Sequence, residues 1–423
     1  MNVNLLKYNE HFEGAIKPED CACLTNKDYN VFFKKKRGDD LPCFTIKADK
    51  DRQSFSMNTG YFIGVDWLEK NKSAIFIAPK LNTNKIEINF VRILFSSLKH
   101  SEVSKEIDEL FEVKWDEPKI TIEQKEDLLT PFLVIEFLGL LKNIVRKGLK
   151  KSYYKVEKNL NSRIKGKVLI AKTLKENLLQ NKPLYTYCSY EEFGLNNKEN
   201  RLLKKALTFI KRYLPTYAEL GNSQDLQNTF NYINPAFDEV SEEIELNDIK
   251  HSKMNVFYKD YEQALKLAKL ILRRFGYSIT NTVKKQVNIP PFWIDMSKLF
   301  ELYVLGLLKD RFNKQIKFHY STYGNELDYL LNTPNYKMVI DAKYKLKYVD
   351  SRVHEDIRQV SGYARLKKVY RELNINTDSI IDCLIIHPDP ENGYENLKEV
   401  NLKEAEIQDY NRIYKVGIKL PVV

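Results

Sequence analysis

The chain has 423 residues, a formal net charge of +11 and a sequence pI of about 9.0, and 43% of its residues are apolar and 12% aromatic. The apolar and aromatic content excludes an intrinsically disordered chain, and the length allows two or three domains. The positive charge is compatible with nucleic-acid binding but does not establish it.

Residues 1–115 predict an irregular, β-rich N-terminal domain. Short runs rich in β-branched and aromatic residues, Ala74–Ala78 and Ile86–Phe90, predict strands. The basic run Lys34–Arg37 could contact DNA or a partner protein, but we favour a solvated loop, since charge runs usually face water.

Residues 116–287 predict a mainly helical middle region. Apolar residues recur at helical spacing over Leu128–Leu149, Asn200–Tyr213 and Tyr261–Phe275, and each segment predicts an amphipathic helix. Between the first two helices, Lys165–Ile170 contains a glycine followed by apolar residues and predicts a tight turn into a strand.

Residues 288–423, after a boundary near Asn288–Pro291, predict a C-terminal domain. The expected elements are helix Met296–Phe312, strands Ile316–Tyr320, Glu326–Leu331 and Tyr336–Tyr344, helix Glu355–Leu373 and strand Ile380–His387. This order of elements predicts an α/β sandwich with a mixed sheet. The whole chain is therefore expected to be an α+β multidomain protein.

Cysteine usage and hydropathy indicate the compartment. The five cysteines are Cys21, Cys23, Cys43, Cys188 and Cys383. No CxxC pair is present and the count is odd, which favours a reducing cytosol, and no fourth ligand at the usual spacing supports a zinc site. The N-terminus lacks a signal-peptide core, and the most apolar stretch, Pro131–Leu141, is too short to span a bilayer. We therefore expect a cytoplasmic protein without membrane contact.

Two carboxylates and a lysine lie on neighbouring predicted strands of the C-terminal domain. Asp328 is on one strand, and Asp341-Ala342-Lys343 follows thirteen positions later on the next. Two carboxylates can share a hard cation such as Mg²⁺, which prefers oxygen ligands and keeps several waters. Because side chains two residues apart share a strand face, Lys343 can position a water for attack on a phosphate. This is the arrangement that a metal-dependent phosphodiesterase requires.

An ordinary ion pair between Asp341 and Lys343 is the main alternative to a metal site. Asp341 ends the apolar run Met338–Ile340, where a charge is costly unless it is paired or binds metal. The ion pair leaves the second carboxylate, Asp328, unexplained, so we favour the metal site.

Three further residues on the flanking predicted helices are candidates for the same site. Glu301, on the preceding helix, could reach the metal directly or through water. Gln359 and Tyr363, one turn apart on the following helix, share a face and could brace the site or contact DNA. Taken singly, each residue also fits an ordinary solvated helix surface.

These residues, in this order, resemble the PD-(D/E)xK nuclease superfamily, in the branch that carries a Gln-x-x-x-Tyr motif. Leu327 stands where that motif has proline. Longer stretches, from about residue 120 to the end of the chain, are similar to the McrC family, the nuclease subunit of the McrBC modification-dependent restriction system. The similar stretches are Ile164–Val168, Cys188–Phe193, Asn200–Lys204, Phe292–Met296, Leu299–Val304 and Asp341–Lys345.

The resemblance implies a Mg²⁺-dependent DNA endonuclease, with Mn²⁺ as an alternative cation. It implies that Asp328, Asp341 and the main-chain carbonyl of Ala342 hold the metal and that Lys343 positions the water. It also implies a McrB-like GTPase ring as partner, methylated double-stranded DNA as substrate, and an N-terminal part that enters the ring and stimulates GTP hydrolysis. The chain has no GxxxxGK[ST] loop, which fits a subunit whose motor is a separate protein.

Two other functions remain open from the sequence. The chain could be a non-catalytic regulator of a GTPase ring, which a metal titration of the free protein would test. It could also be an autonomous DNA-repair nuclease, which cleavage without any GTPase would support.

Overall fold

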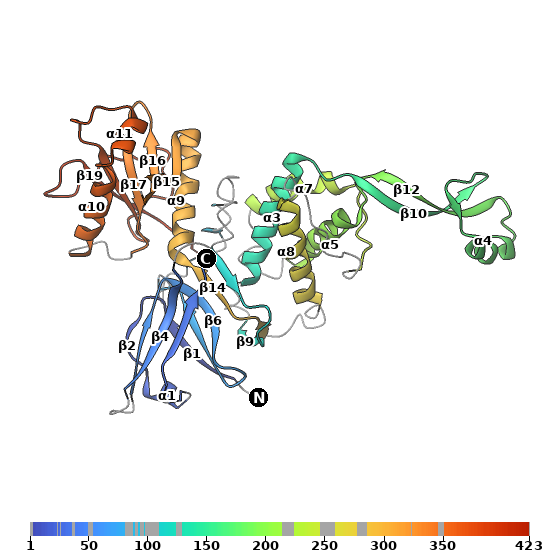
Figure 1. Ribbon diagram of the computed structural model, residues 1–423, viewed down its shortest axis with the longest axis horizontal. Coiled ribbons are helices and arrows are strands. Elements are labelled where there is room, and N and C mark those ends of the chain that lie inside the picture. The colour runs from blue at the N-terminus through green and yellow to red at the C-terminus, as the bar shows by residue number, and fades with distance from the viewer. Residues whose placement is uncertain are drawn as a thin grey trace. The chain divides into compact units, whose positions relative to one another are not determined.

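The protein is described here by a computed structural model. The described residues are 3–22, 24–25, 27–35, 39–49, 54–80, 88, 92–93, 97, 110–123, 129–213, 224–245, 259–276, 286–322, 324–345 and 351–422. The chain forms two compact units, a first unit of Met1–Ile135 with Val283–Val423 and a second unit of Glu136–Thr282 (Figure 1). No helix among the described residues is long and apolar enough to cross a membrane.

The N-terminal part of the first unit contains two sheets. Its elements are β1 (Asn4–Asn9), β2 (Glu13–Ala15), α1 (Pro18–Cys21), β3 (Tyr29–Phe33), β4 (Leu41–Asp49), β5 (Ser54–Thr59), β6 (Phe62–Glu69), β7 (Ser73–Ala78) and β8 (Phe111–Val113). One sheet has the order β2-β5-β4-β3, and the other has the order β1-β7-β6-β14-β8, where β14 is Phe292–Asp295. The strand predicted at Ala74–Ala78 is confirmed as β7. The predicted strand Ile86–Phe90 lies outside the described residues except for Ile88, which bridges Val422.

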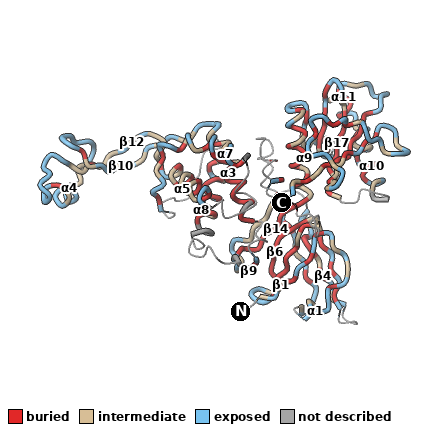
Figure 2. Tube along the Cα trace, turned by 180° about the vertical axis from the view of Figure 1, so that it is seen from behind, coloured by how far each residue is buried: buried red, intermediate tan, exposed pale blue. Residues whose placement is uncertain are grey.

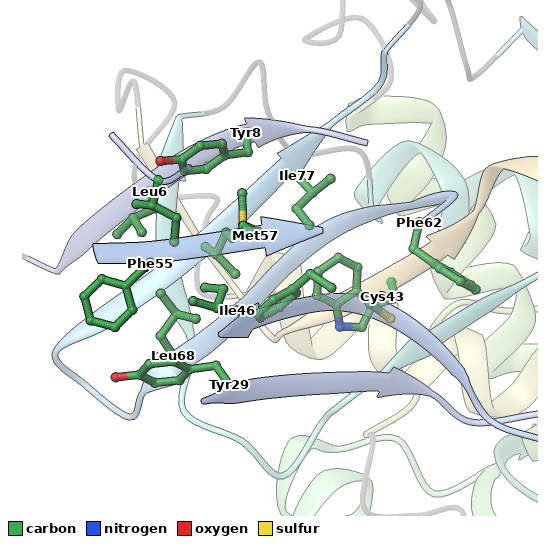
Figure 3. Close-up of a cluster of buried hydrophobic side chains, with 14 of the residues drawn as sticks. Leu6, Tyr8, Tyr29, Cys43, Ile46, Phe55, Met57, Phe62, Leu68 and Ile77 are labelled. Atoms are coloured by element: carbon green, nitrogen blue, oxygen red, sulfur yellow. The ribbon is translucent and has the colours of Figure 1, made fainter. Parts of the chain in front are cut away.

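A single apolar core lies between these sheets, and Figure 3 shows its side chains. β5 alternates exposed and buried residues, as expected of a strand with one face on a core, so Phe55 and Met57 point inward. Trp293, from β14, is fully buried in the same cluster, and its indole N–H donates to Asp66 Oδ2 at 2.8 Å. Residues distant in sequence therefore complete the N-terminal core.

β14 follows the boundary predicted near Asn288–Pro291, yet it pairs with β6 in the N-terminal sheet. Gly64 of β6 has φ +151°, and a side chain there would collide with the carbonyl of Phe292, so only glycine permits this close approach. Just before it, β13 (Gln286–Ile289) pairs with β9 (Ile120–Glu123). The division into 1–115, 116–287 and 288–423 stays a prediction, but the two ends of the chain share a sheet.

The second unit combines helices with a long β-hairpin. Its helices, including α3 that enters it from the first unit, are α3 (Leu129–Lys147), α4 (Ile170–Glu176), α5 (Lys198–Tyr213), α7 (Gln224–Ile233) and α8 (Lys259–Gly276). The three long helices predicted from apolar spacing are confirmed as α3, α5 and α8. The strand predicted within Lys165–Ile170 is shorter than expected, because β11 covers only Lys167–Val168 and α4 begins at Ile170.

The hairpin, residues 152–194, is called the arm below. Its strands β10 (Ser152–Asn161) and β12 (Tyr185–Gly194) pair antiparallel along their whole length, and α4 and the short helix η4 (Leu178–Gln180) lie at its tip (Figure 1). Figure 2 shows that most arm residues are exposed or half-buried. Gly166, with φ +68°, lies against the backbone of Ser189, where any side chain would clash.

The C-terminal part of the first unit is a five-stranded mixed sheet with flanking helices. Its elements are α9 (Met296–Phe312), β15 (Ile316–Thr322), β16 (Asn325–Asn332), β17 (Lys337–Ala342), α10 (Ser351–Tyr363), α11 (Lys367–Leu373), β18 (Asp382–Pro388) and β19 (Ile413–Ile418). The strands follow this order in the sheet. β15, β16 and β17 are antiparallel, while β17, β18 and β19 are parallel. The predicted mixed sheet is therefore confirmed, and β19 is an additional strand.

The single helix predicted over Glu355–Leu373 is wrong, because the chain breaks between α10 and α11. The buried residues Val360 and Ala364 belong to one apolar stripe, whereas Val369 and Leu373 lie out of phase with it. One straight helix cannot bury both stripes. The chain turns after Tyr363, and both helices then pack on the same core, beside Leu327 and Leu330 of β16.

Candidate metal and phosphodiester site

The structure brings Asp328 and Asp341 together on neighbouring strands. Tyr329 of β16 pairs with Ile340 of β17, and continuing that register by one residue places the two carboxylates opposite each other. The Asp328 carboxylate accepts a hydrogen bond from the Ala342 main-chain N–H at 2.8 Å. The predicted pair of carboxylates is thus held at one point of the sheet by the β16–β17 hairpin.

Asp341 is buried and Asp328 is half-buried at the wall of a cavity, and the loss of water makes their negative charges costly. Burial, reinforced by the charges of Asp341 and Glu301, raises the pKa of Asp328 well above its usual value. Burial also raises the pKa of Asp341, although Lys343 opposes this shift. Two like charges in a dry site favour a proton or a cation between them.

Lys343 lies between Asp341 and the following helix. Its Nζ is 2.8 Å from Asp341 Oδ2 and donates to Gln359 Oε1 at 2.8 Å, and Gln359 Nε2 in turn donates to Tyr363 OH at 2.9 Å. Burial lowers the pKa of Lys343, but the nearby carboxylates outweigh burial and raise it, so the amine is a cation. The ion pair that the sequence offered as the main alternative to a metal site is therefore present, with the second carboxylate beside it, and Gln359 and Tyr363 brace the lysine.

Glu301 lies on α9, close enough to Asp328 for its charge to raise the pKa of Asp328. Its carboxylate is 3.8 Å from Lys298 Nζ and 3.7 Å from His319 Nε2. Its main-chain carbonyl accepts a hydrogen bond from Tyr329 OH at 2.6 Å, which fixes α9 against β16. Glu301 thus lies near the carboxylate pair and adds a third negative charge to it.

The donor set fits a hard divalent cation that keeps most of its waters. The described part of the chain has no group of three or more His, Cys, Asp or Glu side chains arranged to hold a metal. Asp341 Oδ2, however, is buried, and its polar contact is the ion pair with Lys343 rather than a well-directed hydrogen bond. A buried carboxylate oxygen whose polar contact is an ion pair, with a second carboxylate beside it, suits Mg²⁺, which commonly takes one or two protein carboxylates and water.

A cavity of about 660 Å³ lies beside Asp328, between the N-terminal strands and α9. Its lining residues are Lys35, Leu41, Tyr61, Phe62, Asp295, Ser297, Lys298, Glu301, His319, Glu326 and Asp328. The sequence analysis missed Lys298 and His319. The spacing of the predicted β15–β16 hairpin could have indicated His319, since it lies across from Asp328.

The residue after Lys343 joins the site to the N-terminal sheets. Tyr344 OH donates to the buried Glu10 carboxylate at 2.8 Å, and Lys80 Nζ donates to the Tyr344 carbonyl at 3.1 Å. Burial raises the pKa of Glu10 to about 6, although Lys80 opposes the shift. Residues more than 260 positions apart therefore hold the end of the Asp-Ala-Lys segment in place.

Comparisons with known proteins agree with the resemblance seen in the sequence. A family model described as McrBC 5-methylcytosine restriction system component matches residues 58–372. No curated protein gives a significant match.

Two solved structures are similar at low identity. A chain of a refined half-complex from the tetradecameric assembly of Thermococcus gammatolerans McrB AAA+ hexamers with bound McrC is 15% identical, over 98% of this chain and 94% of that chain, with a TM-score of 0.40. A chain of the cryo-EM structure of the Thermococcus gammatolerans McrBC complex is 14% identical, over 72% and 87%, with a TM-score of 0.29. Because the family model spans well over half of the sequence, the chain belongs to the family of McrBC 5-methylcytosine restriction system components.

Proposed function

We propose that the chain is the Mg²⁺-dependent DNA endonuclease subunit of a GTP-dependent restriction complex that acts on modified cytosine. The observation that carries the proposal is the pair of half-buried Asp328 and buried Asp341, with Lys343 Nζ 2.8 Å from Asp341. A structural ion pair needs only one of these carboxylates, and holding the second beside it without a cation is unfavourable. Family membership favours the same activity.

In this proposal the C-terminal sheet with α9 and α10 is a PD-(D/E)xK nuclease domain. Asp328, Asp341 and the Ala342 carbonyl would hold Mg²⁺, or Mn²⁺. When bound, the cation neutralises phosphate charge and makes a bound water more acidic. Lys343, fixed between Asp341 and Gln359, positions the attacking water and stabilises the charge that develops on the phosphate.

Glu301, Gln359 and Tyr363 have supporting parts in the proposal. Glu301 orders water around the cation, and the Gln359–Tyr363 pair keeps the Lys343 amine directed at the carboxylates. A second possible role for Gln359 and Tyr363, contact with DNA, stays open because both side chains reach solvent.

We propose that the partner is a McrB-like GTPase ring, as in the complexes to which the chain is similar. The sequence analysis expected residues 1–115 to contact it. The arm is a further candidate, because large apolar side chains gather exposed at its tip. These are Ile164, Ile170, Leu174, Leu178, Leu179 and Leu184. Exposed apolar clusters of this kind mark protein-binding surfaces.

Plasmid cleavage in Mg²⁺ tests the proposal most directly. Methylated and unmethylated plasmids are compared, with the chain alone and with the partner GTPase and GTP. The test variant is Asp341→Asn, and the matched control is Asp378→Asn, at an exposed aspartate of the same sheet region. We expect cleavage of methylated DNA with the partner and GTP, lost in Asp341→Asn and kept in Asp378→Asn.

The other outcomes separate the alternatives. Cleavage by the chain alone would indicate an autonomous nuclease. No cleavage, together with faster GTP hydrolysis by the partner, would indicate a non-catalytic regulator.

A further inference from the structure

We propose that Lys35 and Lys298 bind a backbone phosphate of the DNA strand that enters the cavity beside Asp328. The N-terminal β-rich part of the chain then forms one side of the DNA site rather than serving only as a partner-binding part. The inference builds on the proposed nuclease function and adds two binding residues to it.

The cavity has walls from both ends of the chain. Lys35 follows β3 of the N-terminal part, and Lys298 is in the first turn of α9. Both lysines line this cavity together with Asp295, and the charge of each lowers the pKa of Asp295. Two cations from separate elements around one cavity form a site for a single anionic group.

Lys298 is held in place for this role. Its side chain is only 15% exposed, and its Nζ lies 3.0 Å from His319 Nε2 and 3.8 Å from the Glu301 carboxylate. The ammonium donates, so Nε2 of His319 accepts and the histidine proton lies on Nδ1, which is 3.3 Å from Glu326. A cation already fixed by its neighbours loses little conformational freedom when it binds a ligand.

The backbone of His319 supports this arrangement. His319 has φ +47°, in the left-handed region that non-glycine residues rarely adopt, and it interrupts the ladder between β15 and β16. Its ring stacks on Phe318 at 3.7 Å between centroids. The strained backbone thereby places the imidazole between Lys298 and Glu326, inside the cavity wall.

Lys35 belongs to the basic run Lys34–Arg37, for which the sequence analysis favoured a solvated loop. The described part of this run is anchored, since Lys34 N donates to Glu112 and Lys35 N donates to Asp40. The Lys35 side chain lines the cavity, whereas Lys34 does not. Of the two residues of the run that the structure describes, Lys35 alone lines the cavity.

The carboxylates of the cavity decide when a phosphate can enter. Asp295, Glu301, Glu326 and Asp328 line it together with the two lysines and His319. These four carboxyl groups outnumber the two lysines. A phosphate therefore needs the divalent cation on Asp328 as well, so DNA binding through these lysines is expected to depend on that cation.

The test measures binding of the full-length chain to a short DNA duplex by fluorescence anisotropy, with Ca²⁺ in place of Mg²⁺, over a salt series. Each phosphate that the protein neutralises contributes about 0.9 to the slope of log affinity against log salt, and the two lysines share one phosphate. We expect the double variant Lys35→Ala/Lys298→Met to reduce the slope by about 0.9, and each single variant to weaken binding. Lys35→Arg keeps the charge and should bind as the wild type does, and Lys34→Ala, at an exposed neighbour, should change neither the slope nor the affinity.

The proposal is overturned if Lys35→Ala binds as tightly as the wild type, if the Lys35→Ala/Lys298→Met double variant keeps the wild-type slope, if Lys34→Ala weakens binding as much as Lys35→Ala, or if the chain does not bind the duplex. Thermal melting checks that Lys298→Met is folded, and the exposed Lys35 position carries the test if it is not. Binding is measured without cleavage. Lysine-dependent binding by a chain that does not cut methylated DNA even with the partner GTPase, GTP and Mg²⁺ would therefore refute the nuclease proposal and support this one.

Discussion

Replacing Asp295 by asparagine tests the electrostatics of the cavity, because the direction of the pKa shift of Asp295 sets the sign of the expected change in stability. Asp295 caps α9 by accepting the Lys298 main-chain N–H at 3.0 Å, and it is 8% exposed. Burial raises the pKa of Asp295 to about 6, while the Lys298 N–H and the Lys35 charge oppose the shift. Asparagine keeps an acceptor for the cap but cannot ionise, so the substitution removes only the buried charge.

The magnitude follows from the shift. The ordinary pKa is 3.8, so the folded protein holds this proton about 2 units more tightly than the unfolded chain. The contribution of Asp295 to the free energy of unfolding is therefore greatest at pH values below its pKa in the unfolded chain. It falls by about 3 kcal/mol in all as the pH rises from about 4 through about 6. Asp295→Asn does not lose this stability, because asparagine cannot ionise. We expect it to be about 3 kcal/mol more stable than the wild type near pH 8, but only about 1 kcal/mol more stable near pH 4.5.

Urea denaturation followed by tryptophan fluorescence measures this difference. The three tryptophans, Trp67, Trp115 and Trp293, all belong to the first unit, so their fluorescence reports on that unit alone. Asp295→Ala, which also removes the cap, should be about 1 kcal/mol less stable than Asp295→Asn at every pH. A difference between Asp295→Asn and wild type that does not change with pH would refute the reasoning.

Three further predictions follow from the site and the arm. Tyr344→Phe should destabilise the first unit by about 1–3 kcal/mol, because Glu10 loses a buried donor, and an unchanged urea midpoint would contradict that contact. Lys343→Met should lower the rate of single-turnover DNA cleavage about 10²–10⁴-fold. Asp341→Asn should abolish cleavage and also the rise in melting temperature on adding Mg²⁺, which Lys343→Met should keep. A normal cleavage rate in Lys343→Met would exclude the proposed role of Lys343. Leu179→Glu, at an 81% exposed position, should leave melting unchanged but weaken partner binding about tenfold in a titration, and unchanged affinity would remove the arm tip from the interface.

Local sequence patterns determined most of the C-terminal elements and the heart of the candidate site. α9 and β15–β17 lie close to their predicted positions, because each has a buried face whose period is visible in the sequence. Asp328 and Asp341 come together because a short turn at Thr333–Tyr336 fixes the register of β16 and β17. Only neighbouring residues are needed for that register.

The arm and the break between α10 and α11 illustrate where local patterns failed. β10 and β12 pair mainly with each other, and Leu160 and Cys188 are the only buried residues in the two strands, so no continuous apolar face marks these strands in the sequence. The break between α10 and α11 lets the apolar stripes of both helices pack on the same sheet. The sequence of the two helices alone does not show where that sheet lies.

The sequence by itself indicated that the carboxylate pair and Lys343 lie close together, since Asp328 and Asp341 are on adjacent strands of one hairpin and Lys343 directly follows the second strand. Only the tertiary structure decided that β14 completes the N-terminal sheet, that Glu10 holds Tyr344, and that Lys35 shares a cavity with Lys298. Such contacts join residues hundreds of positions apart. They follow from which surfaces bury each other best in the folded chain, and no local repeat or spacing records that choice.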